Sequence, residues 1–290
     1  MVYSSMGNTS DPTEPPLRIS GTQIADLLGI GWGSPSKVYL KNRMRVEFPD
    51  DDDENKRSGR DLEDYCVKRF VELKGTLLTK LPDKHPSPKH EFMCGSIDRL
   101  IVGPYIDSPY EEGVEAKTSI KLREWGRQGT AEIPPTYFVQ SQWYNELYEL
   151  KRVWVPALVA HRFRLYEVPR DQSIIDGLLE VAERFWRVNL VGGEPPPVDA
   201  SEEYAALTRK LWKRSNGELR DATVEEEILM SALVDAQIAE KCAKTTIEFL
   251  KNKLRHSIGE GDGLTSKERG KVYNRTSKAG VRSLKLYLKG

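Results

Sequence analysis

Residues 92–119 read FMCGSIDRLIVGPYIDSPYEEGVEAKTS, and this stretch decides the fold. In its first half, from Phe92 to Val102, apolar side chains alternate between two faces, which is typical of a strand that ends at Gly103-Pro104. The turn-rich segment PYIDSPYEEG then leads to a second short strand, GVEAKTS. The stretch therefore predicts a β-hairpin with a long tip.

The predicted hairpin carries three charged residues whose chemistry suits phosphate hydrolysis. Side chains two residues apart on a strand share a face, so Glu115 and Lys117 project together. If Asp98 lies on the neighbouring strand, two carboxylates and one ammonium converge at a sheet edge. Carboxylates bind Mg²⁺, or Mn²⁺ in its place, and such an ion activates water and neutralises a scissile phosphate. The same spacing also describes an ordinary surface Glu-x-Lys pair.

Three other segments favour the catalytic interpretation. Asp98 lies in an otherwise apolar strand, where a charge is costly unless something binds it. Gln140 and Tyr144 are four residues apart and share one face of a helix predicted for residues 136–150, so both can hydrogen-bond substrate or metal-bound water. Glu63 belongs to a helix predicted for residues 58–75 and could complete a metal site.

In this order the segments resemble the PD-(D/E)xK nuclease superfamily and, within it, the lambda exonuclease and YqaJ-type viral recombinase family. The resemblance covers residues 17 to about 190 and rests on the motifs ISGTQIADLLGI, SPSKVYL, GRDLEDY, CGSIDR, VEAKTS and YFVQSQWY. It implies an α/β fold: a PD-(D/E)xK, or restriction-endonuclease-like, core with a mixed central sheet flanked by helices, and a helical basic C-terminal extension.

The resemblance also implies roles for single residues. The helix carboxylate, the two metal ligands, the catalytic lysine and the substrate-positioning glutamine of the family match Glu63, Asp98, Glu115, Lys117 and Gln140. Glu63 would act as a further metal ligand.

The family's 5′-phosphate pocket points to other positions. Thr22 and Ser96 are the candidate hydroxyl donors, and Tyr144 is a further candidate for substrate binding. An arginine belongs to the same pocket, but Arg18 does not fall at the matching spacing. Trp32, in the glycine-rich segment GIGWGSP, is the aromatic residue that we most expect to touch DNA.

The remaining segments predict a sequence of helices and strands in the core. Ser20 and Gln23 form a capping-box pattern before a short helix, and SPSKVYLKNRM predicts a second one. The segments VWVPALVA and RFRLYEV predict two strands. Asp171 can cap a helix that continues to Gly192-Gly193.

Composition divides the chain into four predicted parts. Residues 1–16, rich in Ser, Pro, Thr and Gly, predict a flexible arm, and residues 17–191 form the nuclease core. Three prolines in GGEPPPVD, residues 192–199, favour an extended linker. Residues 200–290 predict an α-rich basic extension, with a long helix starting near Thr223 and a final hairpin in KVYNRT and GVRSLKLYL.

The net charge is zero, with 44 Lys and Arg against 44 Asp and Glu, which argues at first against a nucleic-acid partner. The charge is unevenly distributed, however. Residues 241–290 hold 13 basic and four acidic residues, a net +9, so the other 240 residues carry −9. A basic segment that contacts phosphates and acids that hold a metal are together compatible with a nuclease.

Other features bear on compartment and cofactor. No apolar run approaches the roughly 18 residues of a membrane helix, and the N-terminus lacks the basic and apolar regions of a secretory signal. We therefore expect a cytoplasmic protein, in the host cytoplasm if a phage encodes it. Cys66, Cys94 and Cys242, without CxxC spacing, argue against a disulfide framework and against an iron–sulfur cluster.

The sequence thus predicts a Mg²⁺-dependent exonuclease that digests linear double-stranded DNA from its ends, with 5′→3′ polarity expected, to give single strands for phage-type homologous recombination. The resemblance further implies a ring-shaped homotrimer and a single-strand annealing protein as partner. Two alternatives are a structure-specific or restriction-type endonuclease on the same core, and a catalytically dead DNA-binding relative.

Overall fold

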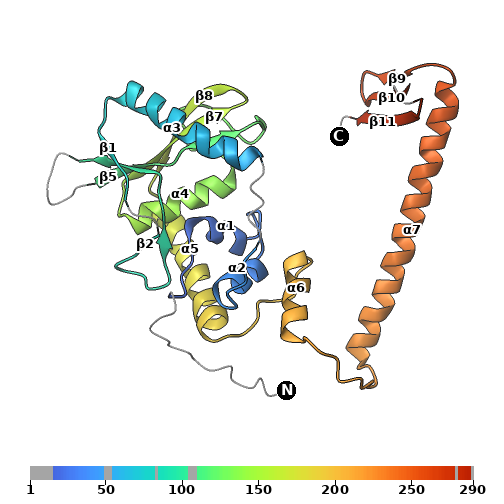
Figure 1. The fold of residues 1–290 in the computed structure, drawn as a ribbon, viewed down its shortest axis with the longest axis horizontal. Coiled ribbons are helices and arrows are strands. Elements are labelled where there is room, and N and C mark those ends of the chain that lie inside the picture. The colour runs from blue at the N-terminus through green and yellow to red at the C-terminus, as the bar shows by residue number, and fades with distance from the viewer. Residues whose placement is uncertain (1–15, 49–53, 82–83, 104–109, 278–279, 289–290) are drawn as a thin grey trace. The chain divides into compact units, whose positions relative to one another are not determined.

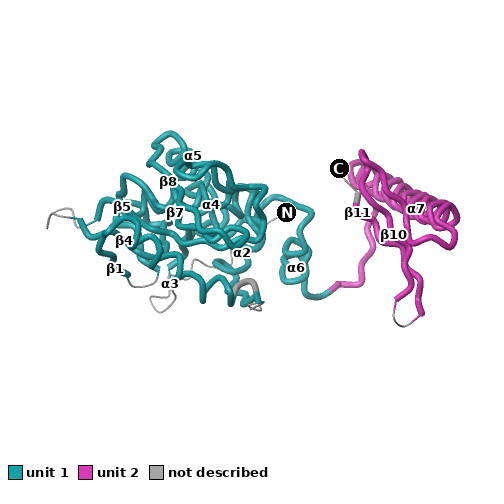
Figure 2. Tube along the Cα trace, turned by 90° about the horizontal axis from the view of Figure 1, so that it is seen from above, with its two compact units in different colours: residues 1–214 teal, residues 215–290 magenta. Residues whose placement is uncertain are grey.

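The chain forms two compact units, residues 1–214 and residues 215–290 (Figures 1 and 2). A computed structural model describes residues 16–48, 54–81, 84–103, 110–277 and 280–288. Most of the predicted N-terminal arm, most of the acidic run at residues 50–54 and the predicted hairpin tip at residues 104–109 lie outside these ranges. Of the described helices, none is long and apolar enough to span a membrane.

In its described residues, unit 1 has three helices, then six strands, a fourth helix, two more strands and three further helical segments along the chain. Its helices are α1 (Gly21–Leu27), α2 (Pro35–Asn42), α3 (Glu54–Lys74), α4 (Pro135–Leu147), α5 (Gln172–Phe185), the π-helical turn η1 (Trp186–Val191) and α6 (Glu202–Leu211). Its strands are β1 (Leu78–Thr79), β2 (His85–Pro86), β3 (Cys94–Gly95), β4 (Arg99–Val102), β5 (Tyr110–Val114), β6 (Lys117–Ser119), β7 (Arg152–Val159) and β8 (Arg162–Pro169).

The central sheet is mixed and has six strands in the order β1-β4-β5-β7-β6, with β8 also paired to β7. β4 and β5 are antiparallel, whereas β5 and β6 both run parallel to β7. Helices pack on both faces of this sheet (Figure 1). The predicted α/β class with a mixed sheet flanked by helices is therefore confirmed.

β7 lies at the centre of the core because helices cover it on both sides. Val153 and Val155 are fully buried in the large apolar cluster that contains residues of α4. Trp154 points the other way and packs with Phe70 of α3 and with Val114. A strand that is buried on both faces reads as a continuous apolar run, which is what VWVPALV shows.

The predicted hairpin is present, but each of its strands is interrupted. Arg99 of β4 pairs with Val114 of β5, so the positions just beyond this pair, 98 and 115, lie at the same end of the hairpin. The line of β5 continues into β6 along β7 after a break at residues 115–116. The Ala116 N–H donates to the Asp98 side chain (2.7 Å), which explains the break, because that amide is withdrawn from the strand ladder.

Two short helices precede the sheet and pack against each other. α1 also packs against α4 and α5, whereas α2 packs against α6 and η1. The Ser20 N–H donates to the side chain of Gln23 (3.0 Å), in the predicted capping box. Ser34 caps α2 by accepting from the Lys37 N–H (3.2 Å). Asp171 accepts from two backbone N–H groups at the start of α5, as predicted.

Unit 1 continues past the proline-rich segment at residues 192–199. Ser36 of α2 donates to Asp199 (3.1 Å), and Lys37 forms an ion pair with Glu203 of α6 (3.8 Å). Leu207 of α6 is fully buried in the main core. The division between the two units therefore falls at residues 214 and 215, after α6.

Unit 2 consists of one long helix and a small antiparallel sheet. Helix α7 (Val224–Ile258) starts at the N-cap Thr223, where the sequence predicts a helix start. Strands β9 (Gly263–Ser266), β10 (Gly270–Thr276) and β11 (Arg282–Leu288) form the sheet in the order β11-β10-β9. The predicted terminal hairpin corresponds to β10 and β11.

Candidate active site

The centre of the candidate site is a pair of carboxylates that the β4–β5 hairpin brings together. Glu115 is buried, with 4% of its surface exposed, and its Oε2 lies 3.3 Å from the Asp98 backbone N–H, which donates to it. Asp98 lies immediately before β4 and accepts from the Ala116 N–H. Two carboxylates that are 17 positions apart in sequence thus occupy one end of the hairpin.

Lys117 and Gln140 both bind the same oxygen of Glu115. The Lys117 ammonium is 2.7 Å from Glu115 Oε1, and the Gln140 side-chain amide donates to that oxygen at 3.1 Å. Gln140 also donates to the hydroxyl of Tyr144, 3.0 Å away, one turn later on α4. The structure therefore brings together five of the predicted site residues: Asp98, Glu115, Lys117, Gln140 and Tyr144.

The electrostatics of the pair differ from those of a solvated surface site. Burial, and then repulsion by Glu115, raises the pKa of Asp98 to about 8. Burial by itself would lower the pKa of Lys117, but the attraction of Glu115 and Asp98 outweighs it and raises that pKa. One ammonium thus faces two carboxylates, and the side chain of Lys117 is only 16% exposed.

The donor set fits a hard divalent cation. Oxygen ligands are those that Mg²⁺ and Mn²⁺ prefer, and a cation beside Asp98 and Glu115 would relieve the repulsion that raises the pKa of Asp98. Within the described ranges, no three Asp, Glu, His or Cys side chains are grouped in a geometry that could hold a metal ion. The protein supplies two converging carboxylates rather than a closed cage.

Glu63, the predicted helix carboxylate, is engaged elsewhere. Its Oε1 accepts from the guanidinium of Arg99 at 3.1 Å, and Arg99 also pairs with Asp64 at 3.1 Å. The thiol of Cys66, one turn further on α3, is buried, and its pKa is raised to about 11 by desolvation and then by the charges of Asp98 and Glu63. Glu63 is thus close enough to influence the site but pairs with Arg99 in this structure.

Sequence reasoning missed two residues of the site. Tyr137 lies three residues before Gln140 on α4, and the Lys117 ammonium is 4.9 Å from the centroid of its ring. Arg99 directly follows Asp98 and holds Glu63. The i,i+3 spacing on α4 could have indicated Tyr137. No local signal indicates Arg99, because its partners lie on a helix 35 residues earlier.

The glycine-rich segment around Trp32 reaches the same end of α4. The Trp32 ring, 74% exposed, lies 5.8 Å from the ring of Tyr137. Thr136 donates to the Ile30 carbonyl at 2.7 Å, which anchors the segment. An exposed indole therefore stands next to the tyrosine that contacts Lys117.

Tyr144 is enclosed by two glycines, one in the motif ISGTQIADLLGI and one in the motif CGSIDR. A Cβ added at Gly21 or at Gly95 would lie 2.9 Å from the Tyr144 ring, which is closer than real contacts allow. Both positions must therefore stay small for the ring to fit. Burial raises the pKa of Tyr144 well above its usual range, so its hydroxyl keeps its proton.

The predicted phosphate-pocket residues lie near the start of α1 and beside β3. Thr22 is exposed, and its hydroxyl is 3.1 Å from that of Ser20. Ser96 is exposed and lies between β3 and β4, two residues before Asp98. Arg18 donates to the Glu91 carbonyl at 3.2 Å, and no contact of its guanidinium with the carboxylate pair is seen in the described part of the chain.

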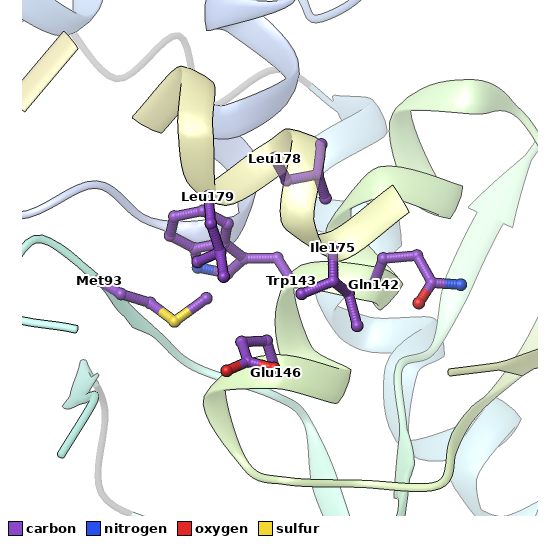
Figure 3. A pocket seen from close by; sticks show the side chains of 7 residues that line it. All are labelled: Met93, Gln142, Trp143, Glu146, Ile175, Leu178 and Leu179. Atoms are coloured by element: carbon purple, nitrogen blue, oxygen red, sulfur yellow. The ribbon is translucent and has the colours of Figure 1, made fainter. Parts of the chain in front are cut away.

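A narrow gap between α4 and α5 is not a second site. Its empty volume is ≈ 120 Å³, which leaves no space for a water molecule. Figure 3 shows the side chains that line it: Met93, Gln142, Trp143, Glu146, Ile175, Leu178 and Leu179. Glu146, which lines it, binds His90 (3.0 Å) and Arg170. These partners outweigh the effect of burial and lower the pKa of Glu146, as expected for a structural ion cluster.

Comparison with known proteins gives matches over this same region. Residues 16–146, which contain the whole of the carboxylate site, match the family model of the YqaJ-like viral recombinase domain. The protein YqaJ of Bacillus subtilis (strain 168) is 27% identical over 256 residues, which cover 84% of this chain and 76% of that protein.

Solved structures with low sequence identity also match. An alkaline exonuclease (LHK-Exo) from Laribacter hongkongensis is 13% identical, with a TM-score of 0.49, over 68% of this chain and 94% of that one. A phage related exonuclease from Haemophilus somnus 129PT is 14% identical, with a TM-score of 0.46, over 62% of this chain and 98% of that one.

Proposed function

Since residues 16–146 match the family model of the YqaJ-like viral recombinase domain, we propose that the chain is a divalent-metal-dependent exonuclease acting on the ends of linear double-stranded DNA. The observation that carries the proposal is the convergence of Asp98 and Lys117 on the buried Glu115 at one end of a hairpin. Structural ion pairs balance their charges, whereas this cluster has an excess carboxylate that a cation would neutralise.

Asp98 and Glu115 would hold Mg²⁺, or Mn²⁺ in its place. A bound divalent ion lowers the pKa of a water molecule and offsets the charge that develops on a scissile phosphate. Glu63 would join the ligands only after its ion pair with Arg99 opens. Arg99 would then be available to bind a DNA phosphate, for which guanidinium groups are well suited.

The remaining polar residues would orient the reactants. Lys117 keeps its proton because two carboxylates surround it, so its ammonium can hold the attacking water and bind the phosphate oxygen that gains charge. The side-chain amide of Gln140 donates one hydrogen bond to Glu115 and another to the Tyr144 hydroxyl, and so fixes both groups. Thr22, Ser96 and Arg18 remain the proposed contacts of the 5′-phosphate.

The experiment that tests the proposed reaction compares a linear duplex with a covalently closed circle of the same sequence in Mg²⁺. An exonuclease digests the linear duplex and leaves the circle intact, because digestion requires an end. Cleavage of the circle would favour the endonuclease alternative. No hydrolysis of either substrate, with retained binding to DNA, would indicate a catalytically dead relative.

Polarity and assembly form separate parts of the proposal. We expect 5′→3′ digestion, a homotrimer and cooperation with a single-strand annealing protein, in the production of single strands for recombination. A duplex labelled on one strand at its 5′ end and on the other at its 3′ end identifies the surviving strand. Light scattering of the full chain measures the mass, which should be three times 33.0 kDa.

A further inference from the structure

One face of the small sheet in unit 2 gathers aromatic and cationic side chains. In the antiparallel pairing of β10 and β11, Tyr273 lies opposite Lys285, Lys271 opposite Tyr287, and Arg275 opposite Ser283. Directly opposed residues share a face, and successive odd positions on one strand share it too. We call the resulting surface the Tyr273 face, and it consists of Lys271, Tyr273, Arg275, Ser283, Lys285 and Tyr287.

The Tyr273 face is the accessible one of the two. On the opposite face Val272 and Asn274 are buried, with 7% and 5% of their surfaces exposed. On the Tyr273 face, Lys271, Arg275 and Lys285 are exposed, and Tyr287 exposes 58% of its surface. In β10 the even positions 272 and 274 are therefore used for packing, whereas the odd positions of the two strands are more open to solvent.

The aromatic rings of the Tyr273 face are fixed relative to one another and to a cation. The centroids of Tyr273 and Tyr287 are 5.7 Å apart with an interplanar angle of 78°, an edge-on contact. The Arg275 guanidinium carbon lies 4.3 Å from the centroid of the Tyr273 ring. Arg275 also faces one acid, Asp262, at 3.6 Å, so part of its charge is neutralised.

A hollow of ≈ 350 Å³ opens on this face. Figure 2 marks β10 and β11 on the chain trace of unit 2. The lining of the hollow consists of Tyr273, Arg275, Thr276, Ser277, Ser283, Lys285 and Tyr287. Ligand sites have volumes of about 300–1,000 Å³, so the hollow is large enough for a specific ligand. Its lining offers planar π surfaces, two cations and hydroxyl groups side by side.

We propose that the Tyr273 face is a binding site for single-stranded DNA. Aromatic side chains stack on unpaired bases, and nearby Lys and Arg follow the phosphates, which is the common chemistry of single-strand binding. In a duplex the faces of the bases are already stacked on one another, so Tyr273 and Tyr287 would contribute little. The site goes beyond the proposed hydrolysis and uses none of its residues.

The test measures binding of the full chain to a labelled 20-nucleotide oligo(dT) in EDTA, where metal-dependent digestion cannot occur. Replacing Tyr287 by Ala should weaken binding roughly 10-fold, and Tyr287→Phe should restore most of it. Arg275→Ala and Lys285→Ala should each weaken binding and reduce its dependence on salt. Digestion of linear duplex from its ends, measured separately, should keep its initial rate.

Matched controls come from α7 of the same unit. Phe249, with 57% of its surface exposed, is an aromatic of nearly the same exposure as Tyr287, and Phe249→Ala should leave binding unchanged. Lys244, which pairs with Glu240, is the control for Arg275 and Lys285, and Lys244→Ala should also leave binding unchanged. Because these residues lie outside the Tyr273 face, they separate a local site from the general basicity of the unit.

Four outcomes would overturn the inference. In the first, Tyr287→Ala binds oligo(dT) as the unaltered chain does. In the second, Arg275→Ala weakens binding to a duplex as much as to oligo(dT), which indicates a phosphate surface without stacking. In the third, oligo(U) binds more tightly than oligo(dT), which indicates RNA. In the fourth, an acidic peptide binds this face and displaces the oligonucleotide. None of these outcomes affects the proposed nuclease activity, which is measured by digestion.

Discussion

Asp98 illustrates how one residue links the fold to the chemistry. Its side chain accepts a hydrogen bond from the Ala116 N–H, which interrupts the strand, and its backbone N–H donates to the Glu115 carboxylate. The sequence predicts that Glu115 and Lys117 share a face, because this depends only on strand geometry. Arg99 and Tyr137 could not be assigned in the same way, because their contacts depend on how α3 and α4 pack on the sheet.

The raised pKa of Asp98 predicts a pH-dependent stability of the metal-free protein. Between about pH 4 and pH 8 the folded state keeps a proton on Asp98 that the unfolded chain has lost, so stability falls as the pH rises through this range. In Asp98→Asn the side chain has no carboxylate to ionise, so this loss of stability at high pH is absent. We expect the variant to be more stable than the unaltered chain at pH 8.5 by about 2 kcal/mol, and by much less at pH 5.

Urea unfolding in EDTA at both pH values measures this difference. Asp176→Asn, an exposed carboxylate on α5, serves as the control and should show the same small effect at pH 5 and pH 8.5. If Asp98→Asn gained no more stability at pH 8.5 than at pH 5, the carboxylate would not be held in the repulsive environment that the structure indicates.

At the scale of elements, local signals predicted the helix starts well. The capping residues Ser20, Ser34, Asp171 and Thr223 stand where helices begin, because caps act within one turn. Strand continuity was predicted less well. The pattern of residues 92–102 suggests one strand, whereas the structure has two short ones, β3 and β4. The break in the partner strand at Ala116 is caused by the side chain of Asp98, which is 18 positions away, so the local sequence pattern does not predict it.

The packing of β3 against α4 gives a prediction on stability. Gly95→Ala places a methyl group 2.8 Å from a methyl of Leu147 and 2.9 Å from the Tyr144 ring, so α4 must shift. We expect a loss of roughly 1–3 kcal/mol in the free energy of unfolding, with a loss of activity because Tyr144 holds Gln140. Gly59→Ala, on α3, meets nothing closer than 3.6 Å and should be neutral or more stable by roughly 0.5–1 kcal/mol.

Chemical denaturation of both variants tests this account of the α4 contact. Equal stabilities for Gly95→Ala and Gly59→Ala would show that the ring of Tyr144 is not confined as described. The digestion rate provides a second measurement, because only the change at Gly95 should reduce it.

At the scale of the whole molecule, the predicted α/β class is confirmed, since the mixed sheet has helices on both faces. Residues 16–146 match the family model of the YqaJ-like viral recombinase domain, in line with the predicted family. The extent of the first unit was harder to predict. The prolines at residues 192–199 indicate only that this segment is locally stiff. They do not show that α6, which follows them, packs on α2 through long-range contacts such as that of Lys37 with Glu203. The first unit therefore continues to residue 214.

This division predicts where the folded chain is most sensitive to proteolysis. The segment between α6 and α7 lacks regular structure and is exposed, with Trp212 at 65% and Leu219 at 102% of their reference areas. Among the described residues, a protease of broad specificity should cut first between residues 212 and 223. Mass spectrometry of the early fragments identifies the site, and a first cut in residues 192–199 would contradict the proposed extent of unit 1.

The central claim is that Asp98, Glu115 and Lys117 form the catalytic centre of a metal-dependent nuclease. The most direct test measures the digestion rate of an end-labelled linear duplex as Mg²⁺ is increased, for the unaltered chain, Lys117→Ala and the control Lys210→Ala, an exposed lysine on α6. The account predicts saturable Mg²⁺-dependent digestion that EDTA abolishes, a loss of at least about 100-fold in Lys117→Ala with retained binding to DNA ends, and no change in Lys210→Ala. Digestion by Lys117→Ala at the unaltered rate, or digestion that persists in EDTA, would contradict it.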